Sequence, residues 1–129
     1  MSMAGALTAW ISAFAFTQAV EIPLYVAVVR RSVRAGVTTR PVSLAAQIAL
    51  AFGASAVTHP IVWFLIPRIP YGPYAEMVAR AELFAVVVEA FYFYVLKVLD
   101  LRRALLWSLV INAMSAGLGL SSRWAFGWP

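Results

Sequence analysis

The stretch Ala81–Tyr94, AELFAVVVEAFYFY, decides the fold of this chain because it combines a run of apolar residues with two carboxylates, Glu82 and Glu89. The two glutamates are seven residues apart, close to two turns of an α-helix, so they share one helical face. Inside a bilayer, an ionisable side chain costs about 2.5–3.5 kcal/mol on insertion scales, and it is retained where it faces a bundle interior or a wet cavity. The stretch therefore predicts a membrane-spanning helix with a polar inner face.

The composition of the rest of the chain agrees with a membrane protein. The chain has 129 residues, of which 64% are hydrophobic and 12% are charged, whereas a soluble domain is about 25% charged. At about 20 residues per span, this length accommodates four helices and short loops. We therefore expect an all-α, polytopic integral membrane protein, with a single membrane domain over residues 1–129 and four transmembrane helices in an antiparallel bundle. The predicted helices cover residues 5–29, 42–66, 74–99 and 104–120.

Charged and helix-breaking residues set these limits. The first apolar segment stops at Arg30 and has no basic stretch before it, so we expect a retained transmembrane helix and no cleaved signal peptide. The second segment follows Pro41, a residue type that suits the first turn of a helix. The connector Pro67–Tyr74, PRIPYGPY, predicts a tight turn, and the polar run Asp100–Arg103 separates the last two helices.

Basic residues are distributed unevenly between the two ends of this predicted bundle. The first and third loops hold most of them: Arg30, Arg31, Arg34, Arg40, Lys97, Arg102 and Arg103. The opposite end holds only Arg68, Arg80 and Arg123. The positive-inside rule then predicts that both termini lie outside and that the basic loops lie in the cytoplasm, and we expect the cytoplasmic membrane of a bacterium. The same rule accounts for the net charge of +5 without nucleic-acid binding.

Aromatic residues are expected to mark the two membrane interfaces. The predicted outer belt consists of Trp10, Trp63, Tyr71, Tyr74, Trp124 and Trp128. The predicted inner belt contains Trp107 and Tyr25, with Tyr92 and Tyr94 as further interface anchors.

Each predicted helix also carries a stripe of polar residues at helical spacing. Because lipid-facing polar side chains are penalised, four such stripes indicate a common polar line inside the bundle. The residues expected to bind an ion or protons are Glu21, His59, Glu82, Glu89 and Asn112. The residues expected to support them are Thr17, Gln18, Ser55, Thr58 and Ser115.

The depth of these residues predicts two layers. With a rise of 1.5 Å per residue, His59 and Glu82 both lie about 7 Å to the outer side of the bilayer centre. Glu21, Glu89 and Asn112 lie about 3–6 Å to the cytoplasmic side. We therefore expect an outer histidine–glutamate pair and an inner cluster of two glutamates and the asparagine. A shift of the helix limits by a few residues would merge the two layers into one site.

Three classes of function could use this polar set. The first is a proton- or cation-coupled transport or channel module with exchangeable glutamates, and acids at two depths favour it. Such a module predicts a water-accessible path and a homodimer, because one four-helix bundle encloses little space. The second is an intramembrane enzyme in which His59, Glu82 and Glu89 hold a divalent metal ion that activates water against a lipidic substrate. The third is a non-catalytic assembly subunit, whose polar core specifies helix pairing and leaves no cavity.

Several kinds of chemistry have no support in the sequence. The chain contains no cysteine, which excludes disulfides, thiolate metal sites and cysteine nucleophiles. It also lacks the HExxH pattern of zinc proteases and the G-x-S-x-G pattern of serine hydrolases. A metal site would therefore need single ligands from different helices.

Overall fold

The computed structural model describes residues 2–37, 43–70 and 72–128, and this part of the chain contains four α-helices. They are α1 (Met3–Arg34), α2 (Leu44–Phe64), α3 (Tyr74–Val95) and α4 (Leu101–Phe126), with a 3-10 turn, η1 (Ile66–Arg68), after α2. The prediction of an all-α chain with four helices is confirmed. Three residues used in the predictions, Arg40, Pro41 and Tyr71, lie outside the described residues.

The prediction that the first helix stops at Arg30 is wrong. Helix α1 continues to Arg34. Arginine is a good helix former, and its long side chain can carry the charge to water while the backbone stays helical. The C-cap of the helix is Ala35, and the next residue, Gly36, has a φ of +67°, a left-handed conformation that costs glycine little. The N–H of Val37 closes the turn on the carbonyl of Ser32 at 3.0 Å.

The limits of α3 and α4 also differ from the predicted ones. Helix α3 ends at Val95, four residues early. Asp100 is the N-cap of α4, and its carboxylate accepts a hydrogen bond of 3.1 Å from the N–H of Arg103. The predicted polar break is therefore a helix start. At the other end, α4 continues to Phe126 and stops at Gly127, which has a φ of +68°.

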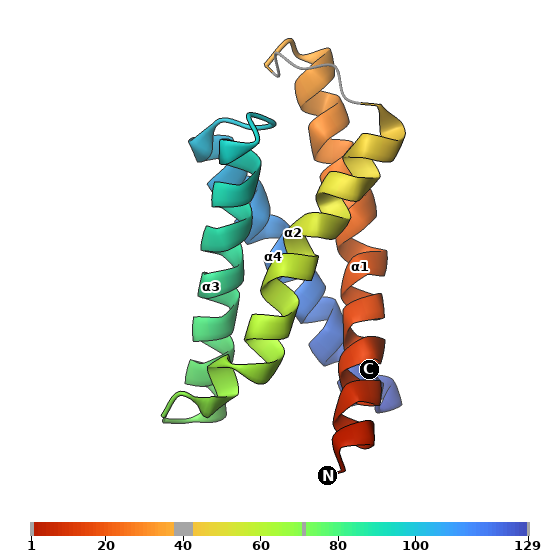
Figure 1. Cartoon of the computed structure of the whole chain (residues 1–129), viewed down its shortest axis with the longest axis vertical. Coiled ribbons are helices and arrows are strands. Elements are labelled where there is room, and N and C mark those ends of the chain that lie inside the picture. The colour runs from red at the N-terminus through yellow and green to blue at the C-terminus, as the bar shows by residue number, and fades with distance from the viewer. Residues whose placement is uncertain (1, 38–42, 71, 129) are drawn as a thin grey trace.

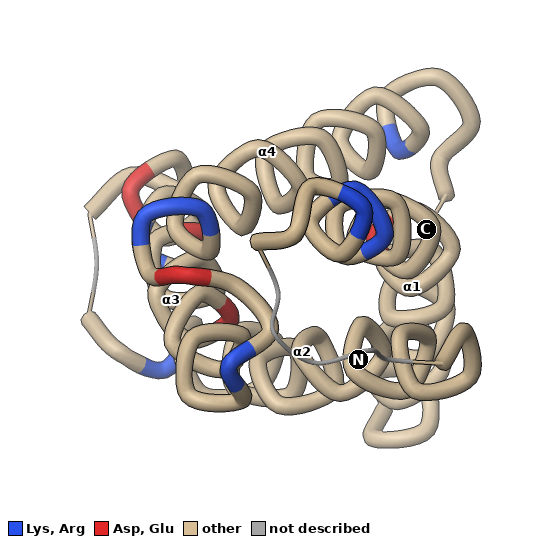
Figure 2. Tube along the Cα trace, turned by 90° about the horizontal axis from the view of Figure 1, so that it is seen from above, with Lys and Arg blue, Asp and Glu red and all other residues tan. Residues whose placement is uncertain are grey.

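Successive helices run in opposite directions and form a closed ring in the order α1, α2, α3, α4 (Figures 1 and 2). Both termini and the connection between α2 and α3 lie at one end, which we call the terminal end (Figure 1). At the other end, α1 and α3 finish and α2 and α4 begin. We call this the basic end, because it carries the arginines at the end of α1 and the start of α4 (Figure 2).

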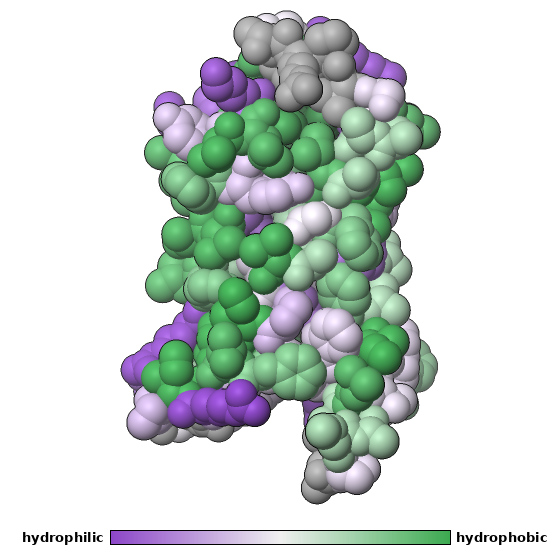
Figure 3. All heavy atoms as spheres, viewed as in Figure 1, coloured by the Kyte–Doolittle hydropathy of each residue, from purple (hydrophilic) through white to green (hydrophobic). Residues whose placement is uncertain are grey.

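The ring has apolar residues outside and polar residues inside. On α3, Leu83 and Phe91 are 65% and 60% exposed, whereas Glu89 is 1% exposed. On the face shown in Figure 3, hydrophobic residues cover most of the middle of the molecule, and the strongly hydrophilic residues gather towards its ends. Within the described residues, three helical segments are long and apolar enough to cross a membrane: α1, α2 together with η1, and α4. Helix α3 is 22 residues long, but its four charged residues, Glu76, Arg80, Glu82 and Glu89, are spread along it, and it is not among these segments.

The apolar core lies mainly towards the basic end. Its largest members are Tyr25 and Phe93, whose rings pack with centroids 4.7 Å apart. Val29 of α1, Leu99 after α3 and Ala104 of α4 complete the packing around them. The interior of the basic half of the ring is therefore packed with side chains, and a cavity between the four helices lies in the other half.

Candidate functional site

A cavity of about 390 Å³ lies between the four helices in the terminal half of the ring. Its outermost walls include Pro67, Tyr74 and Arg123, which belong to the terminal end, and its inner walls include Glu89 and Asn112. The volume is within the range of small-molecule sites, about 300–1,000 Å³. The space is thus a pocket that begins at one end of the ring and reaches its middle.

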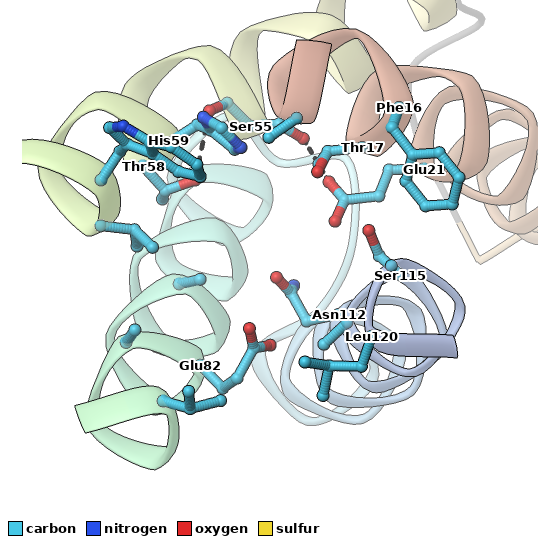
Figure 4. Close-up of a pocket in the computed structure, with 18 of the residues that line it drawn as sticks. Phe16, Thr17, Glu21, Ser55, Thr58, His59, Glu82, Asn112, Ser115 and Leu120 are labelled. Carbon is cyan, nitrogen blue, oxygen red and sulfur yellow. Dashed lines mark hydrogen bonds between the residues drawn. The ribbon is translucent and has the colours of Figure 1, made fainter. Parts of the chain in front are cut away.

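Polar side chains from all four helices line the cavity (Figure 4). Nine of the ten predicted site residues line it: Thr17, Glu21, Ser55, Thr58, His59, Glu82, Glu89, Asn112 and Ser115. The tenth, Gln18, is buried on α1, and its amide donates a hydrogen bond of 3.4 Å to the carbonyl of Phe52 on α2. The two predicted layers therefore form one continuous site.

Glu89 connects all four helices through its carboxylate. Its Oε2 accepts hydrogen bonds from the hydroxyl of Tyr25 on α1, at 2.5 Å, and from Nδ2 of Asn112 on α4, at 2.7 Å. Its Oε1 accepts a hydrogen bond of 3.1 Å from the hydroxyl of Thr58 on α2. The Tyr25 oxygen also lies 3.2 Å from the hydroxyl of Ser108. A buried carboxylate with three donors is a fixed structural centre, because leaving any of these groups unpaired would be costly.

Glu21 accepts fewer hydrogen bonds from the described residues than Glu89 does. It is 2% exposed, and its carboxylate accepts a hydrogen bond from the hydroxyl of Ser55 on α2. The Ser115 side chain of α4 points towards the same carboxylate (Figure 4). Glu21 and Glu89 line the same cavity, so negative charges on the two carboxylates would repel each other.

Glu82 is the acid with free hydrogen-bonding capacity. It is half-buried on α3, two helical turns closer to the terminal end than Glu89. Its carboxylate points into the cavity towards the side of Asn112 (Figure 4). Among the described residues, no hydrogen-bond donor or ion-pair partner is found for it. Glu82 is therefore available to a group that enters the cavity.

The predicted pair of His59 and Glu82 does not form in the described part of the chain. The His59 ring lies instead among aromatic rings, 5.1 Å from Phe14, 6.2 Å from Trp10 and 6.1 Å from Trp63. Trp10 and Phe14 are four residues apart on α1 and stack on each other, so they cover the face of α2 that carries the histidine. Nδ1 of His59 is buried and has no hydrogen-bond partner within the described residues.

The predicted metal set of His59, Glu82 and Glu89 is also not assembled. No group of three histidine, cysteine, aspartate or glutamate side chains suited to a metal ion occurs within residues 2–37, 43–70 and 72–128. The physical reasons are visible in the geometry: the histidine is packed among aromatic rings, and the lone pairs of Glu89 already accept three hydrogen bonds.

Sequence reasoning missed the central role of Tyr25. This residue was expected at the inner aromatic belt, but it is fully buried and bonded to Glu89. A signal for this role was present, because Tyr25 follows Glu21 by four residues and so lies on the same face of α1. Ser108, four residues before Asn112 on α4, shares that face for the same reason and lies beside the tyrosine.

Comparison of the chain with protein-family models, with curated proteins and with solved structures finds no match.

Proposed function

We propose that this chain is a membrane-spanning transport module for protons or cations, in which Glu21 and Glu82 exchange the transported charge and Glu89 holds the site together. The observation that carries the proposal is the cavity, which begins at the terminal end and reaches the buried carboxylates in the middle of the ring. Acids inside a lipid-crossing bundle commonly mark the path of an ion or a proton. The packed core between the site and the basic end would close that path on the other side.

We further propose that the single domain lies in the cytoplasmic membrane of a bacterium with the terminal end outside. Three membrane-length apolar segments and the outward-facing apolar residues of α3 support insertion. The concentration of arginine at the basic end supports a cytoplasmic location for that end. The cavity would then open to the outside.

The geometry favours transport over the two alternatives. An assembly subunit needs all glutamates satisfied and no cavity, whereas Glu82 has no donor among the described residues and a cavity of about 390 Å³ is present. A metal-dependent enzyme needs a metal set, which the described residues do not provide. A homodimer was expected because one bundle encloses little space. The helices of one chain line this cavity without a second copy, so the reason for expecting a dimer no longer applies. The homodimer stays a prediction.

The test is proton and monovalent cation flux in proteoliposomes, measured for the unaltered chain and for Glu21→Gln, Glu82→Gln and Glu76→Gln. Glu76 is the matched control, because it is a half-exposed acid on α3 that forms an ion pair with Arg80 and does not line the cavity. We expect both cavity variants to lose most of the flux and the control to retain it. Flux that is absent from the unaltered chain, or equal in all four proteins, would rule the proposal out.

A further inference from the structure

The cavity is larger and more apolar than a bare ion requires. Its volume of about 390 Å³ compares with about 30 Å³ for one water molecule in the liquid. Between the acids and the terminal end, its walls are aromatic and aliphatic: Phe16, Val62, Trp63, Tyr74, Met77 and Leu120. An inorganic cation in this space would keep a large hydration shell against apolar walls. The walls suit the apolar part of an organic molecule better.

The charge of the cavity is opposite to that of the chain. The whole chain has a net charge of +5 with only five acidic residues, and three of those five line this one space: Glu21, Glu82 and Glu89. Among the described residues, the wall contains a single arginine, Arg123, at the terminal end. A ligand that reaches the interior therefore meets carboxylates, and a positive charge on the ligand would be favoured there.

The hydrogen bonds indicate where that positive charge would lie. Glu89 already accepts from three donors, so it has little capacity for a ligand. Glu21 accepts from Ser55 and Glu82 has no donor within the described residues, and both carboxylates point into the cavity (Figure 4). An ammonium group, with up to three N–H donors, could bond to one of these carboxylates while the other carboxylate lines the same cavity.

The aromatic wall indicates where the rest of the ligand would lie. Trp63 stacks on His59 with ring planes 11° apart, and both rings line the cavity on its α2 side. Aromatic faces attract organic cations and pack well against other rings. An amine with one apolar or aromatic group would thus place its charge among the acids and its apolar part against this wall.

From these observations we propose that the cavity binds an amphipathic organic ammonium ion, with the ammonium in the part of the cavity that Glu21 and Glu82 line and the apolar part against Trp63. The inference rests on the proposed transport function for its biological role, because the bound amine would be the transported cation or a competitor for the same site. The binding site itself stands on the cavity, its acids and its aromatic wall.

The experiment is calorimetric titration of the full chain in lipid nanodiscs with 2-phenylethylammonium, after subtraction of the heat measured with empty nanodiscs. The neutral analogue 2-phenylethanol serves as the ligand control. We expect the ammonium to bind saturably, and the alcohol to bind about tenfold more weakly because it lacks the charge-assisted hydrogen bonds. Glu21→Gln and Glu82→Gln should each weaken ammonium binding by about tenfold, and Glu76→Gln should leave it unchanged.

Trp63→Leu provides a second variant that leaves every acid in place. It should weaken binding of 2-phenylethylammonium several-fold and leave binding of butylammonium, which has no ring, nearly unchanged. This contrast between two ligands on one variant does not depend on whether the glutamine variants fold.

Two results would overturn the inference: no saturable binding above empty nanodiscs, or equal binding of the ammonium and the alcohol. Glutamate-dependent flux of protons or inorganic cations could persist in that case, and only the organic ligand would be wrong. If glutamate-dependent ammonium binding were found without any flux, the binding site would be supported and the transport function would be rejected.

Discussion

The hydroxyl of Tyr25 donates a hydrogen bond of 2.5 Å to the carboxylate of Glu89, which links α1 to α3 across the centre of the ring. Both side chains are almost completely buried, so water could not replace the hydrogen bond of either group if its partner were removed. This bond lies at the boundary between the packed basic half of the ring and the cavity in its terminal half. It therefore contributes both to the stability of the fold and to the position of the candidate site.

Tyr25→Phe should lower the stability of the protein while preserving its shape. The change removes one of three donors to a buried carboxylate, which costs about 1–3 kcal/mol. The measurement is the thermal unfolding temperature in detergent micelles, with Tyr94→Phe as the control. Tyr94 is 48% exposed, so its hydroxyl should matter little. Equal unfolding temperatures for the two variants would show that the Tyr25–Glu89 bond does not contribute.

Asn112→Asp should destabilise the ring more strongly than Asn112→Ser. The Asn112 amide donates to Glu89 at 2.7 Å and to the carbonyl of Ser108 at 2.9 Å. Aspartate replaces this donor with a second carboxylate beside the first, which adds repulsion in a low-dielectric site. The same unfolding assay checks the order of the two variants. If the aspartate variant is as stable as the serine variant, Asn112 does not bond to a charged Glu89.

Gly53→Ala should disturb the contact between α2 and α3. A Cβ at this glycine would lie 2.6 Å from the hydroxyl oxygen of Tyr92, so the tyrosine ring would have to move. We expect a loss of about 1 kcal/mol, within the usual range for overpacking. The double variant Gly53→Ala/Tyr92→Phe should recover most of it, because the hydroxyl is then absent and the next ring atom is at 3.4 Å.

Gly117→Ala is the matched control for this test. Gly117 lies within α4, and a Cβ added there would have no side chain or neighbouring helix within 4 Å. Alanine there should raise stability slightly, by about 0.5–1 kcal/mol, because glycine is a poor residue in a helix interior. Opposite signs for the two alanine variants are the expected result. A gain of similar size at both positions would show that helix propensity, and not the tyrosine contact, dominates.

The proposed orientation can be tested by cysteine labelling, because the chain has no native cysteine to give a background. Ser2→Cys lies at the terminal end and Ala35→Cys at the basic end, and both positions are exposed. In intact bacterial cells, a membrane-impermeant maleimide should label the first and not the second. Labelling of the Ala35→Cys variant alone would show that the orientation is the opposite one, with the cavity open towards the cytoplasm.

The four helices could be predicted from the sequence because the apolar segments are long and separated by recognisable breaks. Their limits could not, since charge alone does not end a helix: α1 continues past Arg30 until Gly36 allows a left-handed turn. Likewise, the acidic residue of the predicted break, Asp100, is a helix cap. In both cases the local backbone geometry, and not the number of charged residues, determines where the helix begins or ends.

The members of the candidate site were predictable, but their partners were not. Helical spacing placed Glu21, Glu89 and Asn112 on inward faces, and nine of the ten predicted residues line the cavity. Which donor reaches which acid depends on how the helices cross and rotate. The sequence pattern does not contain that information. His59 therefore packs among aromatic rings, and the fully buried Tyr25 takes the role of donor to the central glutamate.

The position of the cavity in one half of the ring has an electrical consequence. If water fills the cavity in a bilayer, the electrical potential of the solution at the terminal end extends down to Glu21 and Glu89. The transmembrane voltage then falls almost entirely across the packed half around Tyr25 and Phe93. A charge crossing that short layer would experience nearly the full energy of about 2.3 kcal/mol per 100 mV. Under the proposed transport function, passage of a charge through the protein should depend steeply on membrane voltage, whereas entry into the cavity should hardly depend on it.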